Sequence, residues 1–103
     1  MSYRLTDRAL SDLAEIDQFI AVRMRNPTGA WIVRDYLFEA FANIGRDPLH
    51  CGGRPRPHVT DKPFKFLNVR KYVVIYYDGE EPTAIVAVAG IRQELRQILL
   101  DVP

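Results

Sequence analysis

The chain has 103 residues, of which 48% are hydrophobic and 26% are charged, and its formal net charge is +1. These values predict one soluble globular domain over residues 1–103 and exclude a disordered or fibrous protein. They also exclude a membrane-spanning protein and one that coats nucleic acid indiscriminately, because no apolar run approaches about 18 residues and the net charge is near zero.

The cysteine content and the N-terminal segment indicate the compartment. Cys51 is the only cysteine, so no internal disulfide can form. The first residues, MSYRLTDRAL, lack the apolar core of a secretory signal. We therefore expect a cytoplasmic protein.

Positive charge is concentrated in one segment of the chain. Residues 50–71 carry six Lys or Arg and one Asp, whereas residues 1–49 carry six cations and seven acids, and residues 72–103 carry two cations and five acids. A local excess of this kind predicts a surface for one focused anionic partner.

The first half of the chain predicts a short strand and two amphipathic helices. Tyr3–Leu5 alternates apolar and polar residues, and Thr6 is a plausible N-cap for the first helix. The apolar stripe of that helix has spacings of four, three and four residues: Ala9, Leu13, Ile16 and Ile20. The acids between them are expected to point away from this stripe: Asp12, Glu15 and Asp17.

The break at Asn26-Pro27 separates the first helix from a second one, which we expect Thr28 to cap and Gly45 and Pro48 to end. Apolar residues recur through it with helical period: Ala30, Val33, Leu37, Ala40, Phe41 and Ile44. Two such helices joined by a few residues predict an antiparallel hairpin.

The second half predicts a long loop, three strands and a last helix. The stretch HCGGRPRPHVTDKP (50–63) contains three prolines and a Gly-Gly pair, so it is not regular structure, and its length is typical of a functional loop. Strands are predicted over 64–69, 72–78 and 83–89, and a helix over 92–100. Because 83–89 (TAIVAVA) is apolar on both faces, it is expected to be a central strand.

The element order β-α-α-β-β-β-α predicts an α+β, two-layer domain. Its three consecutive strands form an antiparallel β-meander, the N-terminal helix hairpin packs on one face, and a short C-terminal helix follows. The second face of the sheet is expected to be open and to present the charges of Lys65, Arg70 and Lys71.

Metal and nucleophile chemistry have little support. His50, Cys51 and His58 are the only soft ligands, and no second cysteine pair accompanies them, so we expect no metal site and no cofactor. No protease-type signature surrounds Cys51 and His58. The alternating aromatics of 72–77 could stack on bases, but cross-strand packing with the hydroxyls at the rim is the favoured interpretation.

The basic residues are the strongest candidate site. Three lie at strand ends, three in the preceding loop and two in the predicted last helix: Lys65, Arg70 and Lys71; Arg54, Arg56 and Lys62; Arg92 and Arg96. The meander is expected to bring them to one end or one face of the sheet.

Together these segments resemble the RelE/ParE superfamily of type II toxins. The resemblance extends from about Tyr3 to Leu100, through YRLTDRALSDLAEIDQFI, FEAFANIGRDP, NVRKYVVIYY and IVAVAGIRQELRQIL. It implies the two-layer fold, a cognate antitoxin that wraps the toxin in a hetero-oligomer, and one of two targets. One branch cleaves messenger RNA on the ribosome, and the ParE branch poisons DNA gyrase.

The nuclease branch would require a base, cations and an acid for cleavage of RNA without a metal. The residues that could serve are Arg54, Arg56, His58, Lys65 and Arg92. However, Val73 follows Tyr72 where nuclease relatives often have Arg, Gly90 replaces the histidine that many relatives have at the end of the last strand, and no His or Tyr follows Tyr77.

The ParE branch is therefore the favoured interpretation, as an inhibitor that binds gyrase rather than as an enzyme. The resemblance then implies a target-binding surface formed by Lys65, Arg70, Lys71, Arg92 and Arg96. The alternatives are the ribosome-dependent endoribonuclease and a non-toxic interaction module on the same fold.

Overall fold

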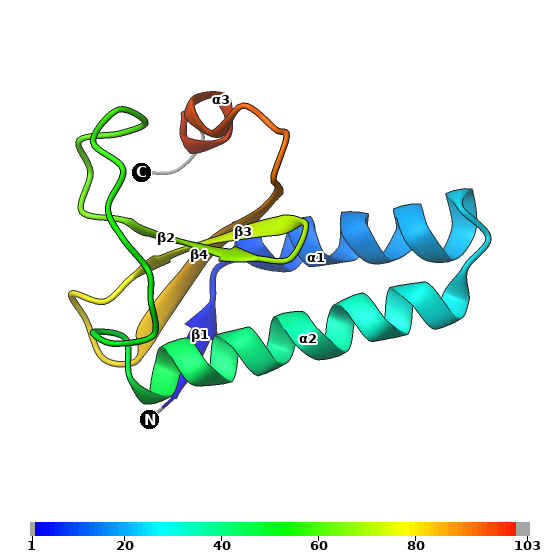
Figure 1. Cartoon of the computed structure of the whole chain (residues 1–103), viewed down its shortest axis with the longest axis horizontal. Helices are drawn as coiled ribbons and strands as arrows, with labels where there is room; N and C mark the ends of the chain where they lie inside the picture. The colour runs from blue at the N-terminus through cyan, green and yellow to red at the C-terminus, as the bar shows by residue number, and fades with distance from the viewer. Residues whose placement is uncertain (1, 101–103) are drawn as a thin grey trace.

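Four strands form one mixed sheet in the order β1-β4-β3-β2 in the computed structural model, which describes residues 2–100 (Figure 1). The elements are β1 Tyr3–Leu5, α1 Asp7–Gln18, a π-helical turn Phe19–Arg23, α2 Pro27–Arg46, β2 Lys65–Val69, β3 Tyr72–Tyr77, β4 Thr83–Gly90 and α3 Leu95–Leu99. The predicted α+β fold, with its helix hairpin, meander and short last helix, is confirmed. No described helix is both long enough and apolar enough to span a membrane.

The meander is antiparallel, and β1 adds to it in parallel. β2 pairs with β3, and β3 pairs with β4, while Tyr3 of β1 lies opposite Thr83 of β4. β4 is a central strand, as its apolar composition predicts, and all but the last of its residues are buried. An extra residue, Val86, forms a bulge opposite β3 and reverses the alternation of side chains along β4.

The caps of the two long helices come from the residues that precede them. The Thr6 side chain accepts a hydrogen bond from the N–H of Ala9, as predicted. The predicted Thr28 cap is wrong: Asn26 accepts from the N–H of Gly29 at 2.9 Å, and Pro27 already stands in the first turn. Proline suits that place because it lacks the N–H that would otherwise be unsatisfied there.

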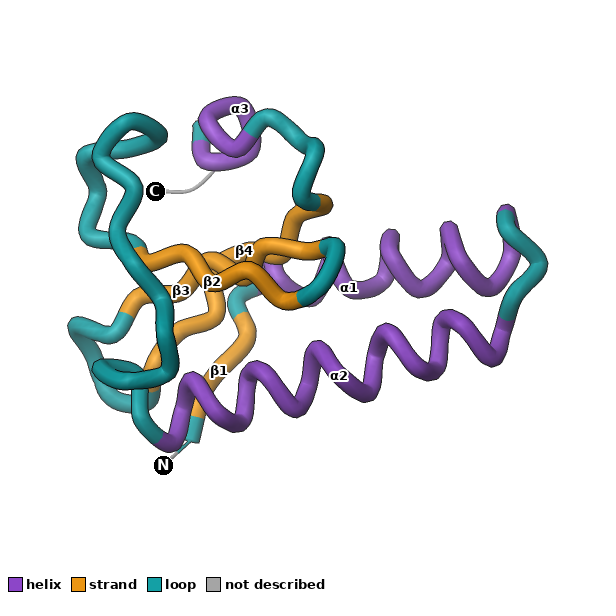
Figure 2. The backbone as a smooth tube through the Cα atoms, viewed as in Figure 1, coloured by secondary structure: helices purple, strands orange, loops and turns teal. Residues whose placement is uncertain are grey.

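The helix hairpin covers one face of the sheet and extends beyond it (Figure 2). The side chains buried between the two layers come from α1, α2, β3 and β4: Ala9, Leu37, Phe41, Ile44, Val74, Tyr76, Ile85 and Val88. Gly45 is required near the end of α2, because a Cβ there would lie 2.8 Å from the main-chain carbonyl of Ser2. The strands are shorter than α2, so the tip of the hairpin has no strand beneath it (Figure 1).

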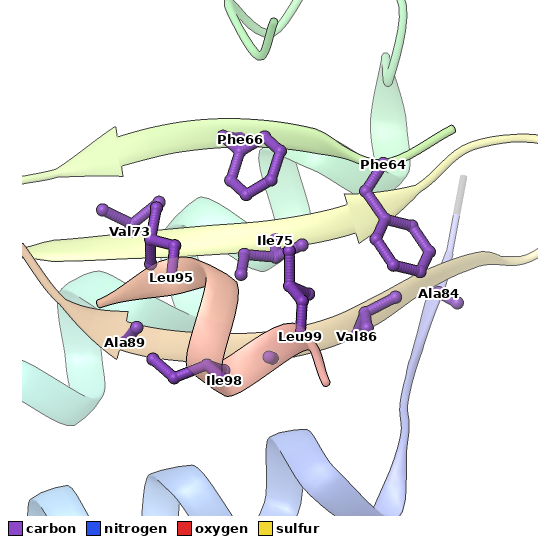
Figure 3. Close-up of a cluster of buried hydrophobic side chains, with 11 residues drawn as sticks. Phe64, Phe66, Val73, Ile75, Ala84, Val86, Ala89, Leu95, Ile98 and Leu99 are labelled. Carbon is purple, nitrogen blue, oxygen red and sulfur yellow. The ribbon is translucent and has the colours of Figure 1, made fainter. Parts of the chain in front are cut away.

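The second face of the sheet is not open, and the expectation that it presents cations is wrong. Helix α3 places Leu95, Ile98 and Leu99 against this face (Figure 3). Val59, from the preceding loop, packs against the same cluster. The sheet is therefore buried on both faces, because the alternating apolar residues of β2, β3 and β4 need a cover on each side.

Helix α3 is shorter than the predicted helix over 92–100. A turn precedes it, in which the Gln93 side chain accepts from the N–H of Gly90 and the Gln93 N–H donates to the Gly90 carbonyl. The Glu94 carboxylate then caps the helix by accepting from the N–H of Arg96.

Asp12 is buried, contrary to the expectation that it points away from the core. Its carboxylate accepts from the N–H of Val88 and from Nε of Arg8, each at 2.9 Å. The three-residue strand β1 ends before it reaches this part of β4, so side chains from the start of α1 take its place: Thr6 donates to the Val86 carbonyl nearby. The core position of Asp12 therefore follows from the shortness of β1.

Asp12 should make stability depend on pH. Burial raises its pKa, and this effect exceeds the lowering by its hydrogen bonds to Val88 and Arg8. In the unfolded chain the Asp12 carboxyl loses its proton near pH 3.9, at a lower pH than in the folded protein. The contribution of Asp12 to the free energy of unfolding is therefore full below that pH and is lost as pH rises through the raised folded-state pKa. In Asp12→Asn the amide still accepts from Val88 but does not titrate. We expect the difference in unfolding free energy, wild type minus Asp12→Asn, to fall as pH rises from about 3.5 to 6.5, as measured by urea unfolding. A flat or rising difference would contradict this account.

Candidate docking groove at the end of the sheet

The structure brings three of the predicted target-binding cations to one end of the sheet. Arg70 and Lys71 form the two-residue turn between β2 and β3, and Arg92 follows β4. The N–H of Ile91 donates to the carbonyl of Lys71 at 2.8 Å, which ties the turn to the segment that carries Arg92. All three cationic side chains are exposed.

Lys65 does not join them. It begins β2, four residues before the strand ends at Val69, which places it about 13 Å along the strand from the turn. Its Nζ lies 2.6 Å from a carboxylate oxygen of Asp78, and both side chains are largely buried. The charge of Lys65 is thus neutralised at the other end of the strand.

The loop cations and Arg96 hold the loop over the second face of the sheet. The main chain of Arg54 pairs with that of Phe66, while the Arg56 guanidinium donates to the Asn68 side chain and lies 5.2 Å from the ring centre of Phe66. Arg96 donates through Nε to the main-chain carbonyl of His58 at 3.0 Å.

The residues proposed for RNA cleavage are therefore divided among three places. Arg54, Arg56 and His58 lie in the loop, Lys65 is paired with Asp78, and Arg92 is at the other end of the sheet. Among residues 2–100 no group of three or more His, Cys, Asp or Glu is placed to hold a metal ion.

Arg92 lines a groove of about 900 Å³, here called the basic groove, between the end of α1 and the end of the sheet that carries Tyr72 and Gly90. Its lining comes from the end of α1 with the π-helical turn, from the ends of β3 and β4, and from the segment before α3: Glu15, Ile16, Gln18, Phe19, Arg23, Tyr72, Gly90, Arg92 and Gln93. A second hollow of about 500 Å³ adjoins it and adds Lys71 and Ile91 to the lining. The groove thus combines exposed cationic side chains with apolar and aromatic ones.

Phe19 and Arg23 are functional candidates that the sequence analysis missed. Both belong to the π-helical turn, the Phe19 side chain is 51% exposed, and the Arg23 guanidinium lies 5.7 Å from the centre of its ring. A π-helical turn shifts side chains out of the α-helical register and is frequent at functional sites. The detectable sequence signal was that Phe19 is a large apolar residue outside the predicted stripe.

The Tyr36 ring positions Arg70, and Tyr36 in turn lies against Tyr72, which lines the basic groove. The Arg70 guanidinium lies 4.5 Å from the ring centre of Tyr36 in α2, and the rings of Tyr36 and Tyr72 are 6.5 Å apart. Burial raises the pKa of both Tyr36 and Tyr72, so both phenols stay neutral at physiological pH. They supply stacking surface and hydrogen-bonding groups without opposing the positive charge.

Gly90 lines the basic groove and leaves room there. A Cβ at this position would meet only the Gln93 side chain, at 3.4 Å or more, which is ordinary contact. None of the described residues that line the groove is a histidine. The arrangement can bind an anionic, partly apolar partner.

The chain matches the family model of the ParE toxin of the type II toxin–antitoxin system parDE over residues 3–95. Its fold is similar to a solved chain of the chromosomal ParDE toxin–antitoxin system from P. aeruginosa, with a TM-score of 0.74 and 18% sequence identity. That similarity covers 89% of this chain and 97% of the other. No curated protein matches.

Proposed function

Because the chain belongs to the ParE toxin family of type II toxin–antitoxin systems, we propose that it inhibits DNA gyrase by binding it through the basic groove, and that a cognate antitoxin neutralises it. The protein would act in the cytoplasm as a binding inhibitor, without a cofactor. The antitoxin would join it in a hetero-oligomer and cover the same groove.

The observation that supports this proposal most is the composition of the basic groove. Arg23 and Arg92 line it, Lys71 lines the adjoining hollow, and Arg70 stands beside it, whereas Glu15 is the one acid among the described residues that line it. Clustered exposed cations around apolar and aromatic surface are typical of sites that bind an acidic protein segment.

The target can be tested with purified proteins. We expect the wild-type chain to inhibit ATP-dependent supercoiling of relaxed plasmid by gyrase in a concentration-dependent way, and addition of the protein encoded by the adjacent gene to restore supercoiling. The readout is the distribution of topoisomers on an agarose gel.

Two other results would overturn the gyrase proposal. If supercoiling is unaffected and induction in cells produces messenger RNA cuts in a fixed position relative to codons, the chain is a ribosome-dependent endoribonuclease. If neither effect occurs and expression harms no cell, it is a non-toxic interaction module.

A further inference from the structure

Two arginines adopt a backbone conformation that favours glycine. Among residues 2–100, Arg25 with a φ of 52° and Arg70 with a φ of 55° are the only non-glycine residues in the left-handed region. A side chain costs free energy there, and a strained residue on the surface indicates a function for that side chain. Arg70 stands beside the basic groove. Arg25 lies just before α2 and does not line the groove, so the groove does not account for its side chain.

Arg25 belongs to the segment 22–27 (VRMRNP), which connects the two arms of the helix hairpin and which we call the hairpin tip. Every residue of the tip is exposed. The Arg23 guanidinium lies against the Phe19 ring, whereas no ion pair joins Arg25 to another residue of the described range. The charge of Arg25 is therefore available to a partner.

The hairpin tip is positively charged and carries exposed apolar side chains. It contains two arginines and no acid. The nearest acids along the chain are Asp17, which is paired with Arg34, and Asp35, which lies about 12 Å further along α2. Met24, between the two arginines, is 57% exposed, and Val22 is 63% exposed. Cations that alternate with exposed apolar side chains favour a partner that is acidic and partly apolar.

The hairpin tip is continuous with the basic groove. Phe19 and Arg23 line the groove, and Arg25 follows Arg23 by two residues, so the Cα atoms of the two arginines lie within about 7 Å of each other. A partner that occupies the groove can therefore also contact the tip. The two surfaces differ in shape, because the groove is concave whereas the tip projects beyond the strands (Figure 1).

This projecting shape favours a folded partner over a flexible segment. A flexible peptide gains buried area by lying in a groove or along the edge of a sheet. A projecting turn is instead buried when its side chains fill a recess of a larger folded protein. The antitoxin segment that covers the groove therefore suits the tip less well than the target enzyme does.

We propose that Arg25 is a second anchor for the target: the hairpin tip enters an acidic recess of gyrase, while the basic groove holds an adjoining acidic segment. This contact rests on the proposed function and adds to it a residue outside the groove. The strain at Arg25 is retained because a glycine in its place would supply no charge.

Arg25→Gly tests the anchor, because it removes the side chain and suits the positive φ. We expect the toxin concentration that halves gyrase supercoiling to rise by about 10-fold or more, while the urea midpoint of unfolding equals or exceeds that of wild type. A residue with only a structural role would lose inhibition and stability together. Arg25→Lys keeps the charge and should restore most of the inhibition.

Met24→Asp tests the tip without changing the strained residue. It places an acid between the two arginines and should also weaken inhibition by about 10-fold or more. Leu49→Asp is the matched control, because Leu49 is 70% exposed but follows the far end of α2, a helix about 30 Å long. It should leave inhibition unchanged. Circular dichroism checks that each variant is folded.

A wild-type chain that leaves supercoiling unaffected would overturn the proposed function, and the contact at Arg25 with it. If wild type inhibits gyrase and the folded Arg25→Gly and Met24→Asp variants inhibit it equally well, only the contact at the tip is overturned. Variants that inhibit gyrase normally but no longer bind the protein encoded by the adjacent gene, as measured by calorimetry, would also overturn it, by assigning the tip to the antitoxin.

Discussion

Replacing Arg92 by glutamate is expected to weaken inhibition of gyrase by about 10- to 100-fold. Arg92 is exposed and lines both the basic groove and the hollow beside it, so reversal of its charge turns attraction of an acidic partner into repulsion. Close charge pairs at protein interfaces contribute about 1.5–7 kcal/mol, and each factor of ten in affinity corresponds to about 1.4 kcal/mol. The measurement is the concentration of toxin that halves gyrase supercoiling.

Arg54→Glu is the control for this charge reversal. It makes the same change in net charge on an exposed side chain, but in the loop beside β2 rather than at the basic groove. Inhibition should be nearly unchanged. If Arg54→Glu and Arg92→Glu weaken inhibition equally, the effect is a general loss of positive charge, and the groove is not the gyrase site.

Arg70→Gly separates binding from folding at the same end of the sheet. Arg70 has a φ of 55°, and a positive φ at the first of two turn residues favours glycine. Relief of that strain, about 1 kcal/mol, should offset the loss of the contact with Tyr36, so stability should stay within about 1 kcal/mol of wild type. Inhibition of gyrase should still fall.

The second large effect is expected at Tyr76, where Tyr76→Ala should cost about 3–5 kcal/mol of unfolding free energy. The side chain is fully buried, and its hydroxyl lies 3.1 Å from the Cys51 sulfur and 3.5 Å from the Pro48 carbonyl, in the segment after α2. A Cβ at Gly53 would lie 1.8 Å from the same hydroxyl, so the loop main chain packs directly on it. The loss is a large share of the roughly 5–15 kcal/mol that stabilises a domain.

Tyr76→Phe is the matched variant, since it removes only the hydroxyl and keeps the ring. It should cost about 1 kcal/mol, as expected for the loss of one hydrogen-bonding group. Urea unfolding of both variants beside wild type provides the comparison. Equal costs for the two would mean that the hydroxyl contacts, not the ring, carry the stability, and would contradict the packing account.

Much of the fold could be predicted because its signals are local. The spacing of Ala9, Leu13 and Ile16 predicted α1, and the stretch 83–89, which is apolar on both faces, predicted the central position of β4. The wrong predictions concern residues whose positions depend on tertiary contacts. Asp12 is polar and was expected outside, but the end of β1 leaves the Val88 N–H without a strand partner, and this carboxylate supplies the acceptor.

The candidate site was predictable only in part, for the same reason. Arg70 and Lys71 meet the segment that carries Arg92 because a meander brings the β2–β3 turn to the end of β4, and the chain order alone implies this. Lys65 was misplaced because its pairing with Asp78 depends on the register of β2 and β3. Phe19 could not be placed from the sequence, because its exposure depends on how far the helix hairpin extends beyond the sheet.

The shortness of β1 affects how other chains can be recognised. Beyond β1, side chains of Thr6, Asp12 and Gln93 already occupy main-chain groups of β4, and the main chain of Arg54 occupies both groups of Phe66 in β2. A foreign strand would have to displace these contacts before it could extend the sheet at either place, which guards the folded chain against polymerising edge to edge. Main-chain pairing between strands depends little on the sequence of the partner, whereas side-chain contacts depend on it strongly. Closure of these positions therefore favours discrimination between a true partner and the partners of related proteins in the same cell.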